Sequence, residues 1–453
     1  MKERIESSVT ALKSFYAEGK THNVNFRIEQ LKRFKAAIIS NQTLIEEALW
    51  KDLHKSKEEA YLTEISIVLQ EINNHIKHLR SWAKPKRVST PLQILPSRSC
   101  ILHEPLGVAL IIAPWNYPFQ LTLNPLVGAI SAGCCAMVKP APSSKETSKV
   151  MEKIIGEAFD SNYIDIVQGG REVNGLLLEQ RYDIIFFTGS PALAKIVSRA
   201  AAEHLTPTVM ELGGKSPCIV DADADIKIAA RRVVWGKFLN AGQTCVAPDY
   251  LFVHESVKGK LIEAMKQQIK EMFGEQPKES RFYPRIITDS AFDRLSTLFS
   301  EGDVVVGGSF DKSERYIEPT IIDNVLPSYK IMQEEIFGPL LPIMSFNDID
   351  KVYTYINKSE KPLAFYFFGS KNSKEALVKC SAGGGCINDT IIHLSNDKLP
   401  FGGVGNSGMG CYHGKESFLA FSNKRALVIS STLIDLPFRY VPFKFFTLVK
   451  KII

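Results

Sequence analysis

Short apolar runs that alternate with helical stretches place the strongest constraint on the fold of this chain. Four such runs follow one another, at 108–113, 136–139, 164–168 and 184–188. This alternation is typical of a doubly wound parallel sheet, in which ligands bind beyond the carboxyl ends of the strands. We therefore predict an α/β fold in which Asn116 and Lys139 lie at strand ends of this kind.

A second α/β set begins near Met210. Its apolar runs lie at 218–220, 250–253, 341–345, 365–368 and 386–388. At 453 residues the chain exceeds the size that one hydrophobic core usually serves. We predict two doubly wound α/β domains, the second of which presents Cys245 toward the first.

Two further segments flank these domains. Residues 1–83 show helical periodicity, with apolar residues such as Leu31 and Phe34 spaced among charged ones. Three prolines interrupt residues 84–99, which should extend along the surface and could pair with another segment. A strand at 425–431 could return to it.

The composition excludes several function classes. Hydrophobic residues make up 45% of the chain and charged residues 23%, as in ordinary globular proteins. The net charge of +6 comes from interspersed acids and bases, without a basic stripe for nucleic acid. The eight cysteines lack zinc-site spacing, and the adjacent pair Cys134 and Cys135 indicates no disulfide framework. We expect reduced thiols, a cytoplasmic protein and no metal.

The two termini carry separate expectations. The charged start at 1–6 lacks the apolar core of a secretory signal, and no run is long enough to span a bilayer. Residues 441–453 form a basic, apolar tail. This tail could lie weakly on the inner face of an anionic membrane, or pack on the protein's own surface or on a partner.

One cysteine occupies a position suited to nucleophilic chemistry. Cys245 follows a predicted helix and a run of small and polar residues at 238–244. A thiol on a glycine-containing loop can be approached closely by substrate, and local dipoles can raise its thiolate fraction. Most free cysteines are instead buried and inert, so the neighbouring residues must decide.

A carboxylate upstream favours the catalytic interpretation. Glu211 follows a strand-like run and precedes the Gly213-Gly214 turn. Burial there would move its pKa toward neutrality, so that it could take a proton from water. A nucleophile with a separate base implies a covalent mechanism with a hydrolytic second half.

A phosphate site is predicted where a buried strand meets a helix. The run 184–188 leads into Gly189, then into Ser190 at an N-cap and Pro191 at the first helical position. The free amides and the positive end of that helix suit a phosphate, although many α/β proteins begin helices in this way for stability alone. The glycine-rich run 403–408 matches the dinucleotide fingerprint in spacing only, because no strand opens a βαβ unit there.

Four motifs follow one another along the chain. They are Pro114-Trp115-Asn116-Tyr117-Pro118, Glu211-Leu212-Gly213-Gly214-Lys215, Gly242-Gln243-Thr244-Cys245 and Glu334-Glu335-Ile336-Phe337-Gly338-Pro339. In this order they resemble the motifs of the NAD(P)-dependent aldehyde dehydrogenases. The resemblance covers about residues 5–430, and the short length together with the run 408–414 is similar to the class 3 branch.

The resemblance implies a catalytic set. Cys245 would attack an aldehyde, through a thiohemiacetal and a thioester, while Glu211 activates the water that releases the acid. The side-chain amide of Asn116 and the backbone N–H of Cys245 would hold the oxyanion. The implied substrates are medium- or long-chain aliphatic or aromatic aldehydes. From the local sequence alone, Asn116 could simply cap a turn.

The resemblance also implies how NAD or NADP is held. The Gly189-Ser190 turn would receive the pyrophosphate, Lys139 the ribose hydroxyls, and Glu335 and Phe337 the nicotinamide ribose and ring. Locally, Lys139 could be a solvated strand-end residue and the other two could belong to the core.

Two neighbouring features bear on the cofactor segment. Many relatives place a carboxylate where this chain has Pro142, so both dinucleotides stay open. Ser143 and Glu146 are predicted to form a capping box for the helix that follows.

The resemblance also implies a homodimer, whose subunits we expect to have two domains. We predict a Rossmann-like NAD(P)-binding domain at 1–83 and 100–209 and a catalytic domain at 210–417. A small β arm at 84–99 and 418–440 would bridge the subunits, followed by the tail. The homodimer and the arm are implied by the resemblance.

Three other function classes remain to be weighed. A cysteine hydrolase would need a histidine linked to Cys245, and none of the nine histidines lies in such a motif. A CoA-acylating relative would discharge the thioester differently, whereas Glu211 favours water. A binding or structural protein would leave the thiol unreactive.

Overall fold

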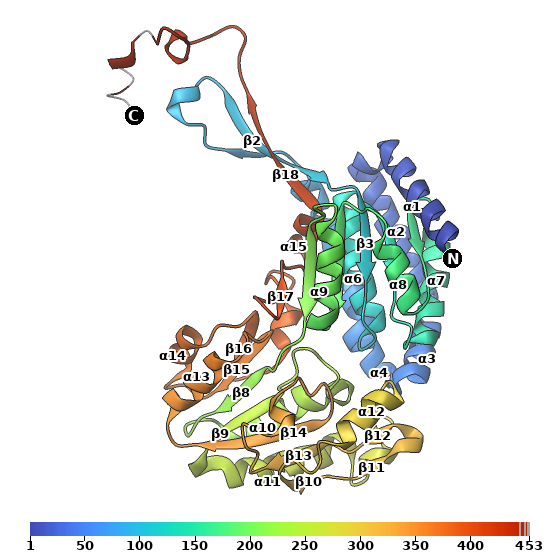
Figure 1. Ribbon diagram of the computed structural model, residues 1–453, viewed down its shortest axis with the longest axis vertical. Helices are drawn as coiled ribbons and strands as arrows, with labels where there is room; N and C mark the ends of the chain where they lie inside the picture. The colour runs from blue at the N-terminus through green and yellow to red at the C-terminus, as the bar shows by residue number, and fades with distance from the viewer. Residues whose placement is uncertain (444, 448–449, 451–453) are drawn as a thin grey trace.

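The computed structural model describes residues 1–443, 445–447 and 450, which form two sheets and a projecting arm (Figure 1). Of the tail expected at 441–453, residues 444, 448–449 and 451–453 lie outside the described residues. Within that described part, no helix is both long enough and apolar enough to cross a membrane.

The first sheet has six strands in the order β17-β7-β6-β3-β4-β5, parallel except for β17. The four runs predicted at its start are confirmed as β3 to β6. Every residue of β3 and β4 is buried, as expected of strands covered on both faces. The strands are β3 (Val108–Ile112), β4 (Cys135–Lys139), β5 (Ile164–Ile166), β6 (Ile184–Gly189), β7 (Thr208–Leu212) and β17 (Gly408–Met409).

The strand that carries Glu211 differs from the prediction. We expected the second set to begin near Met210, but β7 pairs with β6 in the first sheet, and Glu211 lies opposite Thr188. The late strand β17 also pairs with β7. The chain therefore returns to the first sheet after completing the second, because the edge of β7 offers free backbone groups there.

Helices cover both faces of this sheet. The helices α6 and α7 pack on one face and α1, α8 and α9 on the other, while α2, α3 and α5 form an outer layer. The predicted N-terminal helical layer is thus confirmed. The bounds are α1 (Lys2–Ala17), α2 (Val24–Ser40), α3 (Gln42–Leu53), α4 (Lys57–Ala60), α5 (Ser66–Trp82), α6 (Pro118–Ala132), α7 (Lys145–Ala158), α8 (Arg171–Leu178) and α9 (Pro191–Ala202).

The helix α6 is buried along its whole length, which explains its apolar sequence on every face. It ends at Gly133, which has a φ of 96° and caps the helix in the left-handed region. The buried guanidinium of Arg27 donates to Ser131 O at 3.2 Å and to Thr21 O at 2.6 Å beside this end. These contacts fix the helix that begins just after Asn116.

The helix α7 begins differently from the prediction. The expected capping box of Ser143 and Glu146 is wrong, because Ser144 is the N-cap and its side chain accepts no hydrogen bond from the first amides of the helix. The amides of Glu146 and Thr147 instead donate to the carboxylate of Asp52, at 3.1 and 2.7 Å. A residue of α3 therefore replaces the local cap.

The second sheet has seven strands in the order β10-β13-β14-β9-β8-β15-β16, parallel except for the edge strand β10. Its five predicted runs are confirmed, while β10 and β13 were not predicted. The strands are β8 (Pro217–Val220), β9 (Tyr250–His254), β10 (Asp303–Val306), β13 (Thr320–Asp323), β14 (Leu340–Phe346), β15 (Ala364–Phe368) and β16 (Gly384–Ile387). Around them lie α10 (Ile226–Phe238), α11 (Glu255–Phe273), α12 (Asp289–Ser296), α13 (Ile349–Lys358), α14 (Ser373–Lys379) and a hairpin of β11 (Phe310–Asp311) and β12 (Tyr316–Ile317).

A three-stranded arm projects from the body (Figure 1). It consists of β1 (Lys86–Val88), β2 (Arg98–Pro105) and β18 (Ser422–Ile429), all antiparallel. The late strand was predicted at 425–431 as a partner of 84–99, but β18 spans 422–429 and pairs with 98–105, so that only Arg98 and Ser99 of the predicted partner segment take part. The helix α15 (Lys415–Ala420) leads into β18 and packs on α6.

Gly133→Ala should destabilise the fold by about 1 to 3 kcal/mol, because the φ of 96° is strained for alanine and the new Cβ would lie 2.7 Å from Thr21 O. Gly156→Ala is the matched control. Gly156 lies within α7 with nothing within 4 Å of a Cβ, so alanine there should stabilise by about 0.5 to 1 kcal/mol. Urea unfolding measures both changes, and equal effects would contradict this account of the α6 cap.

Candidate active site

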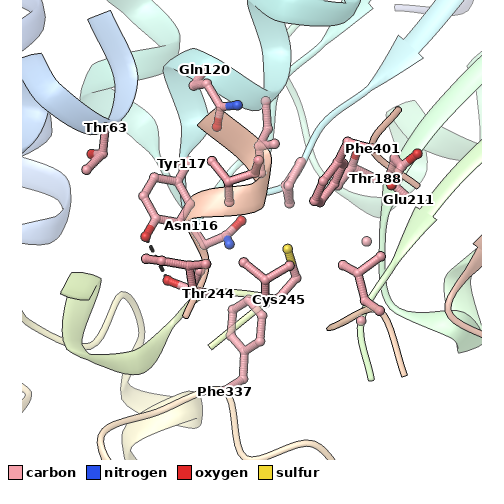
Figure 2. A pocket seen from close by; sticks show the side chains of 18 of the residues that line it. Thr63, Asn116, Tyr117, Gln120, Thr188, Glu211, Thr244, Cys245, Phe337 and Phe401 are labelled. Atoms are coloured by element: carbon pink, nitrogen blue, oxygen red, sulfur yellow. Dashed lines mark hydrogen bonds between the residues drawn. The ribbon is translucent and has the colours of Figure 1, made fainter. Parts of the chain in front are cut away.

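One cavity of about 590 Å³ collects most of the residues predicted to be functional. It is lined by Asn116, Gly189, Ser190, Glu211, Cys245, Glu335 and Phe337, among others. Figure 2 shows the Cys245 sulfur pointing into this space, between Asn116 and Glu211, with Phe337 nearby. These side chains come from both sheets, so the cavity lies where the two meet.

Lys139 does not line this cavity. It ends β4 next to the end of β3, as predicted, but its side chain is buried and donates to Pro140 O at 2.7 Å. Burial lowers its pKa to about 8.

The loop before Cys245 has an unusual backbone. Asn240, Ala241 and Gly242 follow one another with φ values of 53°, 51° and 73°. A Cβ on Gly242 would lie 2.3 Å from Gly338 O, so this position must be glycine. The turn brings the nucleophile loop against the Gly338 segment that follows Glu335 and Phe337.

Gln243 fastens this loop to a distant segment. Its side-chain amide donates to Arg285 O and to Asn240 O, both at 3.0 Å, and its carbonyl oxygen accepts from Ile287 N at 3.1 Å. The glutamine of the motif is therefore a structural residue, with its hydrogen bonds turned away from substrate.

Asn116 is held in place by hydrogen bonds of both its side chain and its backbone carbonyl. Its Nδ2 donates to Gln243 O at 3.0 Å, and its carbonyl oxygen accepts from Asn240 Nδ2 at 2.8 Å and from Lys55 Nζ at 3.0 Å. An amide nitrogen carries two hydrogens, so one N–H of Asn116 remains for a ligand beside Cys245. The next residue, Tyr117, exchanges a 2.7 Å hydrogen bond with Thr244 (Figure 2).

Burial shifts the pKa values of the two reactive groups. Burial, and then the carboxyl groups of Glu335 and Glu211, raise the pKa of Cys245 to about 12. Backbone N–H groups of Cys245 and Val246 oppose this shift, as expected of local dipoles, but do not overcome it. Burial also raises the pKa of Glu211 well above its ordinary value, the predicted direction. Neither oxygen of the Glu211 carboxyl has a hydrogen-bond partner among the described residues.

The other end of the cavity offers groups for a dinucleotide. Ser190 caps α9, accepting from Leu193 N at 3.4 Å, and Pro191 opens the helix as predicted. Glu335 Oε1 is buried without a partner in the described part of the chain, and a Cβ on Gly213 would lie 2.1 Å from its other oxygen. Phe337 has a φ of 50° and packs edge-on against Trp115, with ring centroids 5.4 Å apart.

An apolar wall completes the cavity and was not predicted. It is contributed by Leu62, Ile67, Leu121, Trp235, Ile391 and Phe401. These residues come from four separate parts of the chain and belong to no motif. Only their meeting in the fold identifies them.

The comparisons with known proteins agree with this geometry. The sequence model of the aldehyde dehydrogenase family matches residues 1–427. The 4,4'-diaponeurosporen-aldehyde dehydrogenase of Staphylococcus aureus is 46% identical over 97% of both chains. The dimeric NADP-preferring aldehyde dehydrogenase of Rattus norvegicus is 44% identical over 95% of both chains. A solved substrate-bound state of Staphylococcus aureus AldH is 45% identical, with a TM-score of 0.97 over 99% of both chains. The chain therefore belongs to the aldehyde dehydrogenase family.

Proposed function

We propose that this chain oxidises an aldehyde to its carboxylic acid through a covalent adduct on Cys245. The thiolate of Cys245 forms a bond to the carbonyl carbon, and the carbonyl oxygen becomes an oxyanion. The free N–H of Asn116 and the backbone N–H of Cys245 stabilise that charge, a contribution worth about 3 to 4 kcal/mol per donor. Glu211 then takes a proton from water, which attacks the thioester and releases the acid and the thiolate.

One observation carries this assignment. The structure brings Cys245, Asn116 and Glu211 to one cavity, although they lie on different segments. A cysteine hydrolase is disfavoured, because among the described residues the hydrogen-bonded cysteine–histidine pair is Cys386 and His393, 3.6 Å apart. Cys245 has Glu211 beside it instead.

We propose that NAD or NADP occupies the other end of the cavity. Glu335 Oε1, which has no hydrogen-bond partner among the described residues, suits a ribose hydroxyl. Phe337, which packs against Trp115, would lie beside the nicotinamide ring, and the amides at the start of α9 suit the pyrophosphate. When bound, the nicotinamide accepts the hydride that turns the adduct into a thioester. Lys139 stays in the proposal as a ribose ligand whose side chain must leave Pro140 O to reach it.

The proposed substrates are medium- or long-chain aliphatic or aromatic aldehydes. The support is the apolar wall of the cavity, which includes Leu62, Ile67 and Leu121. Apolar surface removed from water contributes about 25 cal/mol per Å² to binding. A panel of aldehydes assayed with both dinucleotides tests this choice, and turnover of short polar aldehydes alone would contradict it.

The proposal extends to assembly and location. We propose a cytoplasmic homodimer joined through the arm, with weak membrane contact limited to the C-terminal tail. A relative named as dimeric and the exposed apolar residues Val428 and Ile429 of β18 support the dimer. The domain boundaries predicted from the sequence also belong to this proposal, with β7 and β17 assigned to the first domain.

Cys245→Ser should lower aldehyde-dependent NAD(P)H formation by about 10³-fold or more while dinucleotide binding is retained. Glu211→Gln should still release one NAD(P)H per site in a burst, followed by steady turnover about 10²-fold slower, because hydrolysis has lost its base. Stopped-flow absorbance measures both phases. Cys100→Ser, on the arm, is the control for thiol loss. Rapid steady turnover of Glu211→Gln would show that another base operates.

Alkylation of Cys245 by iodoacetamide should rise with pH from pH 7 upward, by up to about tenfold per unit, since its pKa of about 12 lies above the assay range. Burial raises the pKa of Glu335 to about 8, so this group gains its charge within the range and opposes the thiolate. Glu335→Gln should therefore match the wild type near pH 7 and react several-fold faster above pH 8. Glu334→Gln, an exposed neighbour, is the control. Peptide mass spectrometry reads the site, and parallel profiles for all three proteins would refute this coupling.

Val428→Asp should give monomers, because it introduces a charge on the proposed interface strand β18. Val304→Asp is the matched control, since Val304 is an exposed valine on the edge strand β10. Sedimentation at micromolar concentration compares the two with the wild type. A wild-type monomer, or a Val428→Asp dimer as stable as the control, would contradict assembly through the arm.

A further inference from the structure

A buried ion pair lies directly behind Asn116. Lys55 Nζ and Glu64 Oε1 are 2.5 Å apart, and both side chains are fully buried. Removing two charges from water is costly unless further hydrogen bonds satisfy the remaining atoms. The other contacts of this pair therefore indicate what it is for.

Those contacts hold the chain at Asn116 and at the start of the helix that follows it. Lys55 Nζ donates to Asn116 O at 3.0 Å and lies 4.0 Å from the centre of the Tyr117 ring. Glu64 Oε2 accepts from Phe119 N at 2.8 Å and from Gln120 N at 3.2 Å, the free amides at the start of α6. The carbonyl of Asn116 and the first turn of the next helix are thus tied to one pair of charges.

A local irregularity places Glu64 in this position. A π-helical turn, η2 (Tyr61–Ile65), interrupts the helix between α4 and α5. Such turns insert one residue and often occur at functional sites. Here Leu62 and Thr63 line the cavity, whereas Glu64 and Ile65 are buried. Figure 2 shows Thr63 and Gln120 at the same end of the cavity, above Tyr117.

We propose that Lys55 and Glu64 are positioning residues for the oxyanion site, an inference that rests on the proposed function. The pair fixes the peptide unit of Asn116, so that one side-chain N–H bonds Gln243 O and the other faces the carbonyl oxygen of the substrate. Neither charge touches the substrate. Without Lys55, Asn116 O retains only Asn240 Nδ2 as a donor among the described residues, and the amide loses its fixed direction.

A double-mutant cycle tests this role. Lys55→Met should lower kcat about 10- to 100-fold, with KM and dinucleotide affinity changed less than threefold, because the loss falls on the transition state. Asn116→Ala should lower kcat about 100- to 1000-fold. The double variant should be no slower than Asn116→Ala within threefold, since Lys55 acts through that amide. Lys57→Met, an exposed lysine two residues away, should match the wild type.

A neutral pair keeps the test valid if Lys55→Met fails to fold. Lys55→Met with Glu64→Gln removes both charges of the pair and retains an oxygen for the α6 amides, and it should show the same loss of kcat. The proposal would be overturned if the loss of kcat in the double variant equalled the product of the losses in Lys55→Met and Asn116→Ala. It would also be overturned if a folded Lys55 variant had a kcat within twofold of the wild type. Full activity of Asn116→Ala would overturn the oxyanion assignment itself, and with it the positioning role. Loss of activity on Asn116→Ala with an unaffected Lys55 variant would leave the proposed function standing and remove only this inference.

Discussion

A left-handed turn at Asn240, Ala241 and Gly242 is the constraint on which the rest of the site depends. Non-glycine residues in this conformation cost on the order of 1 to 3 kcal/mol each, so tertiary contacts must hold them there. Glu59 accepts from Asn240 N at 3.0 Å, and the Asn240 side chain donates to Asn116 O. The strain is offset by hydrogen bonds from the N-terminal helical layer and from the segment before α6. Cys245 is therefore presented by a loop that is stable only when both sheets are assembled around it.

The same assembly explains the electrostatics of the cavity. Cys245 and Glu211 both have raised pKa values, and in both cases burial is the first cause. Burial disfavours the charged forms of the thiol and the carboxyl, and the same low-dielectric surroundings strengthen each hydrogen-bond donor at the oxyanion position. The apolar lining that suits an aldehyde therefore also contributes to the raised pKa values of the two reactive groups.

Much of the fold could be predicted because its determinants are local. Strand runs such as 108–113 are apolar over their whole length, and the sequence Gly189-Ser190-Pro191 contains its own cap and helix start. The failures occurred where a distant group replaced a local one. Asp52 caps α7 in place of Ser143 and Glu146. The strand β7 pairs with the edge of β6 and so belongs to the first sheet. The strands β10 and β13 also escaped prediction.

Neighbouring residues specify the alternation of strands and helices, the family motifs and the chemical types of the reacting groups, so these features can be predicted from the sequence. Which of these groups meet depends on how the whole chain folds. Lys55 and Asn116 are 61 residues apart, and Gln243 bonds Arg285 across 42 residues. In the folded chain the side chain of Lys139 donates to Pro140 O and does not line the cavity. Burial raises the pKa of Cys245, although the nearby backbone N–H groups act to lower it. Burial and long-range hydrogen bonding depend on what packs around a side chain, and no local pattern contains that information.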